Sequence, residues 1–407
     1  MKRIIFLSRF FFPDNSDISQ IVTDLAFHLA FQGRSVHVVT SQQRYDDPEA
    51  QLPAEKIVAG VHIHRLPTGR FRFGRSELLG RSLDYASFYA SLWSSLNKLV
   101  NPGDILIAKT DPPLISLPAM LIAERRQAHL VNWLQDLYPE TANSLGCRFL
   151  KGYIGHALIY LRDRSLRAAR ANVVVGERMA ELVRSSGTAP ERVHVIPNWA
   201  HDEKISPIPP ALNLLRRDLN LQGKFVVGYS GNLTRAHEVE TLLAAATQLR
   251  NEPKIVFLFI GGGDRLTALS DRAKEHGLPD SFRFLPYQER HMLKHSLSAP
   301  DVHWLSLRPE LEGLVVPSNF YGIAAAGRPI IAITVRHSEI ARLVRQHECG
   351  IVIQPGDAQA LAAAIVSLSM DTKRVAEMGR CARQMLDAYF TRQRAFSRWQ
   401  DVLDHLE

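Results

Sequence analysis

The chain has 407 residues, a length that suits two α/β domains better than one ordinary core. Apolar residues make up 46% and charged residues 22%, which is the balance of a soluble globular protein and excludes a disordered chain. The formal net charge of +8 indicates an anionic partner, and on charge alone nucleic acid, a phosphorylated substrate and an anionic lipid surface all stay open.

The cysteines and the first residues indicate the cellular compartment of the protein. Cys147, Cys349 and Cys381 are far apart and odd in number, which argues against a disulfide framework and for a reducing compartment. The apolar start is broken by Arg9 and Pro13, so it predicts a buried strand and not a signal peptide. No run approaches 18 apolar residues, so we expect a protein that touches a membrane without crossing it.

In the first half of the chain, short apolar runs alternate with amphipathic segments. The pattern predicts strands over residues 3–8, 35–40, 105–108, 130–133, 171–175 and 193–196, with helices over 19–32 and 116–126. Strands that alternate with helices predict a parallel sheet covered on both faces.

The second half repeats the theme after a proline-rich linker near residues 197–212. Strands are predicted over 224–230, 255–260, 282–285, 302–305, 330–333 and 351–353, with helices over 239–250 and up to residue 274. The last segment, 392–406, is predicted to be an amphipathic helix that is too short to form a domain and must pack on one.

Residues 231–237 lie where a predicted strand turns into a helix. Such a turn presents backbone N–H groups and a positive helix end, which suits a phosphate. Gly231 and Asn232 begin the turn, and Arg235 and His237 would add charge to it. The alternative is an ordinary turn with a solvated arginine. A second glycine turn, which contains Gly262, either approaches a ligand closely or simply reverses the chain.

The stretch 310–329 is the most specific part of the sequence. Two carboxylates, Glu310 and Glu312, precede a glycine loop. Ser318 or Asn319 can then cap a short helix of small residues, which points its N-terminus at the ligand. The alternative is a well-made helix in a sheet protein.

In this order and spacing the motifs resemble the bacterial family 4 glycosyltransferases, which are retaining enzymes of the GT-B fold. The closest match is the branch that transfers N-acetylhexosamines and related sugars in O-antigen, colanic acid and capsule synthesis. The resemblance covers nearly the whole chain. Its landmarks are residues 11–14, 135–140, 195–199, 231–237, 284–287 and 316–329.

The resemblance implies an α/β protein of two facing Rossmann-like domains with parallel sheets and a cleft between them. The acceptor-binding domain would span residues 1–205 and the nucleotide-sugar-binding domain 206–388. A C-terminal helix, 389–407, would pack back toward the N-terminal domain.

The resemblance also implies site residues in the second domain. The family's Arg/Lys pair for the diphosphate would fall near Asn232 and His237, with Arg235 as a substitute cation. Glu312 matches the first glutamate of the family signature, which contacts the donor sugar, whereas the second falls at Gly322. We therefore expect backbone groups near Ser318 and Asn319 to contact the ribose in place of that glutamate. Backbone groups near residues 284–288, including Leu285, would meet the base.

The expected reaction uses a nucleotide sugar, with a UDP-sugar favoured, as a substrate and no cofactor. Arg235, His237 and the helix that begins near Asn319 would stabilise the leaving diphosphate. No DxD pair ends a predicted strand, so we expect no metal. Retention in the family is thought to proceed by same-face attack, so no nucleophile is assigned. Asp136 would position the acceptor hydroxyl, and a structural role for it is the alternative.

Basic and apolar residues interleave in two stretches, which are typical of an interfacial membrane contact. The first contains Arg70, Phe71, Arg72, Phe73, Arg75, Leu78, Leu79 and Arg81, and the second spans residues 148–170. We expect a peripheral protein on the inner face of the cell membrane, with a polyprenyl-diphosphate-linked acceptor. A solvated helix face over a core stripe is the alternative.

Two other functions fit parts of the pattern. A GT-B nucleotide-sugar 2-epimerase shares the architecture, but the matching segments favour transfer. A non-enzymatic anion- or nucleic-acid-binding protein is suggested by charge alone. The sequence has no helix-turn-helix, RRM or zinc pattern, so no nucleic-acid partner is expected.

Overall fold

The computed structural model describes residues 2–14, 16–45, 47, 49–69, 77–147, 152–200, 205–278 and 280–407. The chain folds into two compact units. The first combines Met1–Pro197 with Phe396–Glu407, and the second is Asn198–Ala395.

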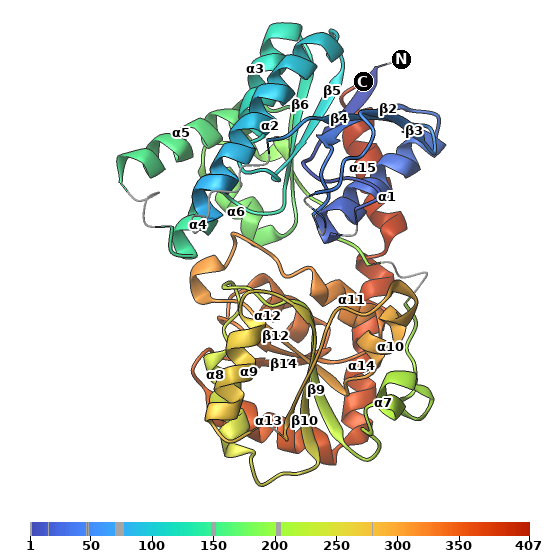
Figure 1. Cartoon of the computed structure of the whole chain (residues 1–407), viewed down its shortest axis with the longest axis vertical. Coiled ribbons are helices and arrows are strands. Elements are labelled where there is room, and N and C mark those ends of the chain that lie inside the picture. Colours follow the sequence, from blue (N-terminus) through green and yellow to red (C-terminus); the bar gives the residue numbers. More distant parts are fainter. Residues whose placement is uncertain are drawn as a thin grey trace. The chain divides into compact units, whose positions relative to one another are not determined.

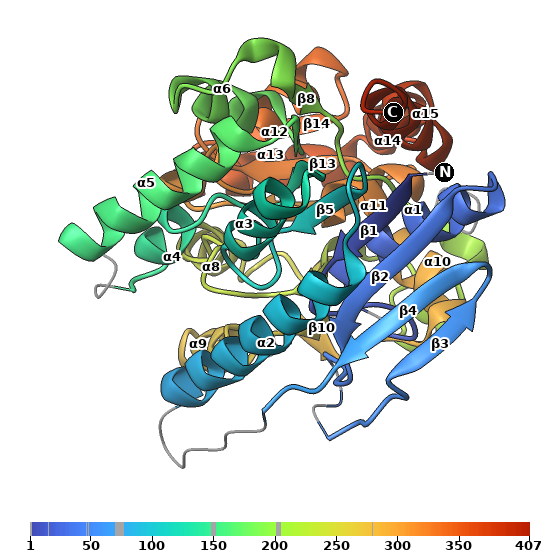
Figure 2. The ribbon, with the colours of Figure 1, turned by 90° about the horizontal axis from the view of Figure 1, so that it is seen from above.

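The first unit is built on an eight-stranded sheet in the order β3-β4-β2-β1-β5-β6-β7-β8. Its strands are β1 (Arg3–Leu7), β2 (Ser35–Ser41), β3 (Glu55–Val58), β4 (Val61–Leu66), β5 (Ile105–Lys109), β6 (His129–Leu134), β7 (Ala171–Val174) and β8 (Val193–Val195). All neighbours pair in parallel except β3 and β4, which form an antiparallel hairpin. Figure 2 shows this hairpin beside β2 at one edge of the sheet.

Helices cover both faces of this sheet. They are α1 (Asp17–Phe31), α2 (Glu77–Leu99), α3 (Ser116–Arg126), α4 (Glu140–Ser144), α5 (Tyr153–Ala168), α6 (Glu177–Ser185) and α15 (Arg392–Asp404). Phe88 and Leu92 of α2 and Ile122 of α3 pack against Ile5 and Leu106 in one buried cluster. The continuous apolar strands are therefore buried on both sides, as parallel sheets require.

From Phe396 onward the C-terminal helix α15 belongs to the first unit, where it lies beside α1 (Figure 1). The ring of Phe396 stacks on His28 of α1 with centroids 4.3 Å apart. Trp399 packs edge-on against Trp133 of β6, with centroids 4.6 Å apart. The side chain of Arg34 pairs with Asp404 and Glu407 at the end of the chain.

The unit boundaries differ from the sequence-based divisions after residues 205 and 388. Ala200 and Ile205 are buried in a core cluster of the second unit, so the division falls after Pro197. Helix α14 (Thr372–Tyr389) and Phe390 also contribute to that cluster. Buried apolar residues within the proline-rich segment therefore place most of that segment in the second unit.

The second unit has a six-stranded, fully parallel sheet in the order β11-β10-β9-β12-β13-β14. Its strands are β9 (Phe225–Asn232), β10 (Ile255–Gly262), β11 (Phe282–Leu285), β12 (Val302–Ser306), β13 (Ile330–Ile333) and β14 (Gly350–Ile353). Its helices are α7 (Leu214–Asp218), α8 (Glu240–Gln248), α9 (Leu266–Glu275), α10 (Leu293–Ser298), α11 (Asn319–Ala325), α12 (Glu339–Gln346), α13 (Ala358–Met370) and α14.

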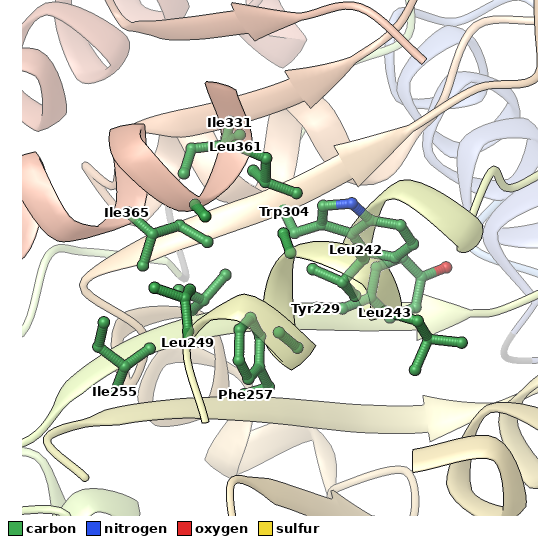
Figure 3. Packing of buried hydrophobic residues seen from close by; sticks show 14 of the residues in the cluster. Tyr229, Leu242, Leu243, Leu249, Ile255, Phe257, Trp304, Ile331, Leu361 and Ile365 are labelled. Carbon is green, nitrogen blue, oxygen red and sulfur yellow. The ribbon is translucent and has the colours of Figure 1, made fainter. Parts of the chain in front are cut away.

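The core of the second unit lies in two layers, one on each face of the sheet. Figure 3 shows the layer under α8 and α13, where Leu242 and Leu361 meet Tyr229, Phe257 and Trp304 of the strands. The opposite layer is formed by α10, α11, α12 and α14 against β12 and β13. This three-layer arrangement holds the carboxyl ends of the strands in fixed register.

The predicted strands of both units are present, but the β3–β4 hairpin was missed. Residues 55–57 of β3 are exposed, so the segment has no apolar alternation to mark it as a strand. The hairpin is held by pairing with β2, a long-range contact that local pattern cannot indicate.

Candidate functional site

The strand order marks one place in the second sheet where a ligand is expected. From β9 the chain continues to β10 and β11 on one side, whereas β12, β13 and β14 lie on the other. Open α/β sheets bind ligands beyond the carboxyl ends of the strands at such a switch point. The turn 231–237 follows β9, and Arg308 follows β12 by two residues.

The turn is anchored to both neighbouring strands. The Leu233 amide donates to the Gly262 carbonyl of β10 at 2.7 Å. On the other side, the Arg308 amide donates to the Ala236 carbonyl at 2.9 Å, and the Glu238 amide donates to Ser306 Oγ at 3.1 Å. The turn is thus a fixed element that joins β10 to the end of β12.

The glycines of the two strand ends allow β9 and β10 to approach each other. A Cβ on Gly261 would lie 2.0 Å from the Gly231 carbonyl oxygen, and one on Gly263 would lie 2.1 Å from the Leu233 oxygen. A Cβ on Gly262 would meet the ring of Tyr287 at 2.8 Å. Close packing against backbone and against the Tyr287 ring therefore accounts for these three glycines. A contact between Gly262 and a ligand remains a prediction.

His237 is not the cation that the sequence predicted. Its Nδ1 accepts the Thr234 amide proton at 3.1 Å, and its Nε2 lies 3.1 Å from the hydroxyl of Tyr229. Its ring packs edge-on against Tyr229 and near Trp304. Burial in this aromatic setting lowers the pKa of His237 to about 4, so the imidazole is neutral at physiological pH. It braces the turn and adds no charge.

A glutamate side chain of the protein already binds the start of helix α8. Oε1 of Glu238 accepts the Thr241 amide proton at 3.1 Å, which caps the first turn of the helix. The N-terminus of α8, where the sequence predicts phosphate binding, is therefore already bound by a carboxylate of the protein. Any anion bound at this turn needs side-chain cations.

Arg235 is the exposed cation of the turn itself. Its Nε lies 3.3 Å from Oδ2 of Asp264, and both side chains are more than half exposed. Such an exposed pair contributes little to stability, so the guanidinium is available to an anionic ligand. Asn232 is also exposed and carries no charge.

Glu312 supports a helix. Its Oε1 accepts the Glu339 amide proton at 3.0 Å, at the first residue of α12. Ser338 caps the same helix through the Ala341 amide at 2.9 Å. Glu312 therefore stabilises the start of α12, and the donor contact that the resemblance implies remains a prediction.

The short helix α11 begins differently from the prediction. Ser318 occupies the N-cap position in a helical conformation and makes no capping hydrogen bond with its side chain, so Ser318 does not cap the helix as expected. Asn319 is the first helical residue. Gly322 packs toward Leu297, where an added Cβ would find ordinary contact at 3.5 Å.

Leu285 ends β11, opposite Ile260 of β10 in the sheet register. Its side chain packs on a small apolar cluster that includes Val256 and Leu258. Its carbonyl end faces the same edge of the sheet as the turn, because all the strands are parallel. A contact between this backbone and a base remains a prediction.

The first sheet has its own switch point, between β1 and β5. Arg9 follows β1, and its amide donates to the Asp111 carbonyl beyond β5 at 2.9 Å. The Arg9 guanidinium lies over the ring of Tyr85 at 4.9 Å and over that of Phe10 at 5.2 Å. Asp136 follows the next strand, β6, so the sheet brings it to the same edge as Asp111.

The two carboxyl groups at this edge interact electrostatically. Burial raises the pKa of Asp111 to about 6, with Arg9 acting against the rise and Asp136 adding to it. Burial also raises the pKa of Asp136, and a hydrogen bond from the Thr110 side chain opposes that rise. Carboxyl groups tuned in this way are typical of functional sites.

Both units match family models. Residues 18–199 match the glycosyl transferase 4-like domain, and residues 213–385 match glycosyl transferases group 1. The chain is 32% identical over 304 residues to the probable glycosyltransferase WbjE of Pseudomonas aeruginosa, which covers 72% of this chain and 73% of that protein. The chain belongs to the group 1 glycosyltransferases.

A more distant relative agrees with this assignment, and a solved structure shares the fold. The glycosyltransferase is 25% identical over 368 residues to the putative colanic acid biosynthesis glycosyl transferase WcaI of Escherichia coli K12, covering 87% of this chain and 88% of that one. Its fold matches that of Anabaena HepE, solved in complex with UDP-glucose, with a TM-score of 0.72 at 17% identity over 100% of this chain and 99% of that one. The two parallel-sheet units are those of the GT-B fold.

The two stretches of basic and apolar residues that the sequence predicts to contact a membrane fall partly outside the described residues. Arg70, Phe71, Arg72, Phe73 and Arg75 lie there, and the side chains of Leu78, Leu79 and Arg81 do too. Of the second stretch, residues 148–151 also lie outside. No helix in the described part of the chain is both long and apolar enough to span a bilayer.

Helix α5 exposes apolar side chains, but not every arginine that the sequence placed on this surface is exposed. Tyr153, Ile154 and Tyr160 are 96%, 46% and 64% exposed. Arg162, by contrast, is buried and pairs with Glu140 at 2.7 Å, so it adds nothing to a surface charge.

Four functional candidates were missed from the sequence of the glycosyltransferase: Arg9, Asp111, Glu238 and Arg308. Asp111 could have been found, because it follows a predicted buried strand at the same edge as Asp136. Arg308 could not, because only the strand order reveals that β12 lies beside β9. Within the described residues, no cluster of three or more His, Cys, Asp or Glu side chains is arranged to hold a metal ion.

Proposed function

We propose that this glycosyltransferase moves a sugar from a nucleoside diphosphate sugar to a lipid-linked glycan acceptor in cell-surface polysaccharide synthesis. A hexosyl or N-acetylhexosaminyl group is the favoured cargo. The observation that carries the proposal is the turn 231–237, which holds the exposed guanidinium of Arg235 at the switch point of the second sheet.

A UDP-sugar is the favoured donor. The structures of Anabaena HepE with UDP, and with UDP-glucose, have TM-scores of 0.73 and 0.72 to this chain. The departing diphosphate develops negative charge, and a preorganised guanidinium stabilises that charge. The reaction needs no metal in this proposal, because side-chain cations take the role that a divalent ion plays elsewhere.

The acceptor is assigned to the first unit. Asp136 would accept a hydrogen bond from the attacking hydroxyl, at the edge where Arg9 and Asp111 also lie. Retention of the anomeric configuration follows from the family resemblance, with same-face attack and no protein nucleophile. WcaI supports the assignment to polysaccharide synthesis, since it is named for colanic acid biosynthesis.

A lipid-linked acceptor brings the enzyme to the inner face of the cell membrane as a peripheral protein. The exposed tyrosines and isoleucine of α5 supply apolar area for that contact. Arg164 and Arg167, which are exposed on the same helix, supply positive charge for anionic lipids.

A panel of UDP- and GDP-sugars, screened by thermal unfolding of the purified chain, tests the donor assignment. A ligand that binds only the folded state raises the unfolding midpoint, by an amount that grows with its concentration over its Kd. We expect at least one UDP-sugar to raise the midpoint more than any GDP-sugar. A panel with no shift at millimolar concentration would remove the basis for the proposal.

A further inference from the structure

We propose that Arg308 carries the second positive charge for the diphosphate of the donor, opposite Arg235. The inference rests on the proposed function and names a binding residue that neither the motifs nor the family signature assigns. Arg308 adjoins the turn through its amide, which donates to the Ala236 carbonyl at 2.9 Å.

The need for a second cation follows from what occupies the turn. A diphosphate carries more than one negative charge, and Glu238 adds another at the start of α8. His237 is neutral and Asn232 is uncharged, so the family's cation pair contributes no charge here. Arg235 alone would leave most of the charge uncompensated.

The position of Arg308 satisfies this need. It lies at the carboxyl end of β12, across the switch point from the turn that follows β9. Arg265 also contacts the turn, because its amide donates to the Leu233 carbonyl at 3.1 Å. Arg265, however, follows β10 on the other side of β9, and its charge acts on Glu240 of α8. Only Arg308 of these two flanks the switch point.

The guanidinium of Arg308 can be released to a ligand. Its Nε lies 3.4 Å from Oε2 of Glu310, with the two side chains 35% and 54% exposed. An exposed pair of this kind contributes about 0–1 kcal/mol. A planar guanidinium binds phosphate oxygens through two parallel hydrogen bonds, which a surface carboxylate pair does not prevent.

Calorimetric titration of the full chain with UDP, GDP, uridine and guanosine tests the inference. We expect Arg308→Gln to weaken binding of the preferred nucleoside diphosphate by roughly 10- to 100-fold and to leave nucleoside binding unchanged, since the charge-assisted hydrogen bonds of one guanidinium are lost. Arg265→Gln is the matched control and should stay within about twofold of wild type.

Glu310→Gln separates a phosphate role from a structural one. If Glu310 competes with the diphosphate for Arg308, this variant binds the nucleotide as tightly as wild type or a few-fold more tightly. If the pair only holds the loop, Glu310→Gln and Arg308→Gln weaken binding alike, and the inference fails. Arg308→Lys, which keeps the charge, should recover part of the preference for diphosphate over nucleoside.

The outcomes distinguish the two proposals. Suppose that wild type binds UDP or GDP more tightly than the corresponding nucleoside, and that Arg308→Gln binds the diphosphate within twofold of wild type. This result overturns the role of Arg308 and leaves the proposed function standing. An equal loss of nucleoside diphosphate affinity in Arg308→Gln and Arg265→Gln also overturns that role, because the effect then does not depend on which arginine is removed. Wild type without any preference for the diphosphates overturns both. Unfolding midpoints of the ligand-free variants show that the fold is kept.

Discussion

At the scale of single residues, environment decides which groups carry charge. His237 and Arg235 stand two positions apart in one turn, yet burial lowers the pKa of His237 to about 4 and leaves its imidazole neutral at physiological pH. Tyr229 and Trp304 enclose the imidazole, while the guanidinium is exposed beside Asp264. The aromatic partners come from β9 and β12, so the protonation state of His237 depends on the fold and not on the motif.

Arg235→Ala should lower kcat strongly while the fold stays intact. The variant removes a preorganised donor to the departing diphosphate, a loss that typically costs roughly 3 kcal/mol, or about 100-fold in rate. Steady-state turnover with a saturating donor measures the effect. Arg250→Ala, an exposed arginine at the opposite edge of the sheet, is the control. A near-normal kcat for Arg235→Ala would show that the turn does not bind the leaving group.

Asp111 should make the first unit less stable as the pH rises. Its folded pKa of about 6 lies above the value of 3.8 for a free side chain, so its favourable contribution is complete below about pH 4 and is lost as the pH passes 6. That difference corresponds to at most about 3 kcal/mol. Asp111→Asn should therefore gain stability over wild type between pH 4 and pH 7.5. Denaturant unfolding at several pH values checks this, and parallel curves for both proteins would contradict it.

At the scale of elements, the strands that carry an apolar run were predictable and the contacts between elements were not. The runs 282–285 and 330–333 became β11 and β13 with unchanged limits. The exposed strand β3 was missed, and so was the role of Glu312, whose partner Glu339 is 27 residues away. Local pattern reports burial along one segment, whereas the candidate site depends on which segments become neighbours.

Helix α14 packs on the turn that follows α11 through two glycines, and an added methyl group there should be costly. A Cβ on Gly379 would lie 2.3 Å from the Gly327 carbonyl oxygen. We expect Gly379→Ala to lower the free energy of unfolding of the second unit by about 1–3 kcal/mol. Gly322→Ala, where the nearest atom is a leucine methyl at 3.5 Å, should be neutral or stabilising. Similar unfolding energies for the two variants would show that the helices can separate at no cost.

Helix α5 should contribute to membrane binding through its apolar side chains. The double variant Ile154→Ser, Tyr160→Ser is expected to sediment less with anionic vesicles than wild type and to bind the nucleotide sugar unchanged. Phe31→Ser, at the end of α1, is the control because Phe31 is 87% exposed but on another helix. Equal sedimentation of all three proteins would mean that α5 does not meet the bilayer.

At the scale of the whole molecule, the chain returns at its end to the unit in which it began. Trp399 packs on Trp133 and Phe396 on His28, so the end of the chain joins elements that lie hundreds of residues earlier. The sequence predicted two parallel-sheet units and a packed terminal helix, because each has a strong apolar period. Each unit then places its polar candidates at one switch point, Arg9 and Asp111 in the first and Arg235 and Arg308 in the second.

The most direct test of the central claim is transfer itself. Purified enzyme would be incubated with radiolabelled UDP-sugars and with lipid extracted from a bacterium that makes surface polysaccharide. We predict that label from one donor enters the organic-soluble fraction with wild type, and that Arg235→Ala reduces this incorporation about 100-fold. Incorporation by Arg235→Ala at the wild-type rate, or none from any nucleotide sugar with wild type, would contradict the account.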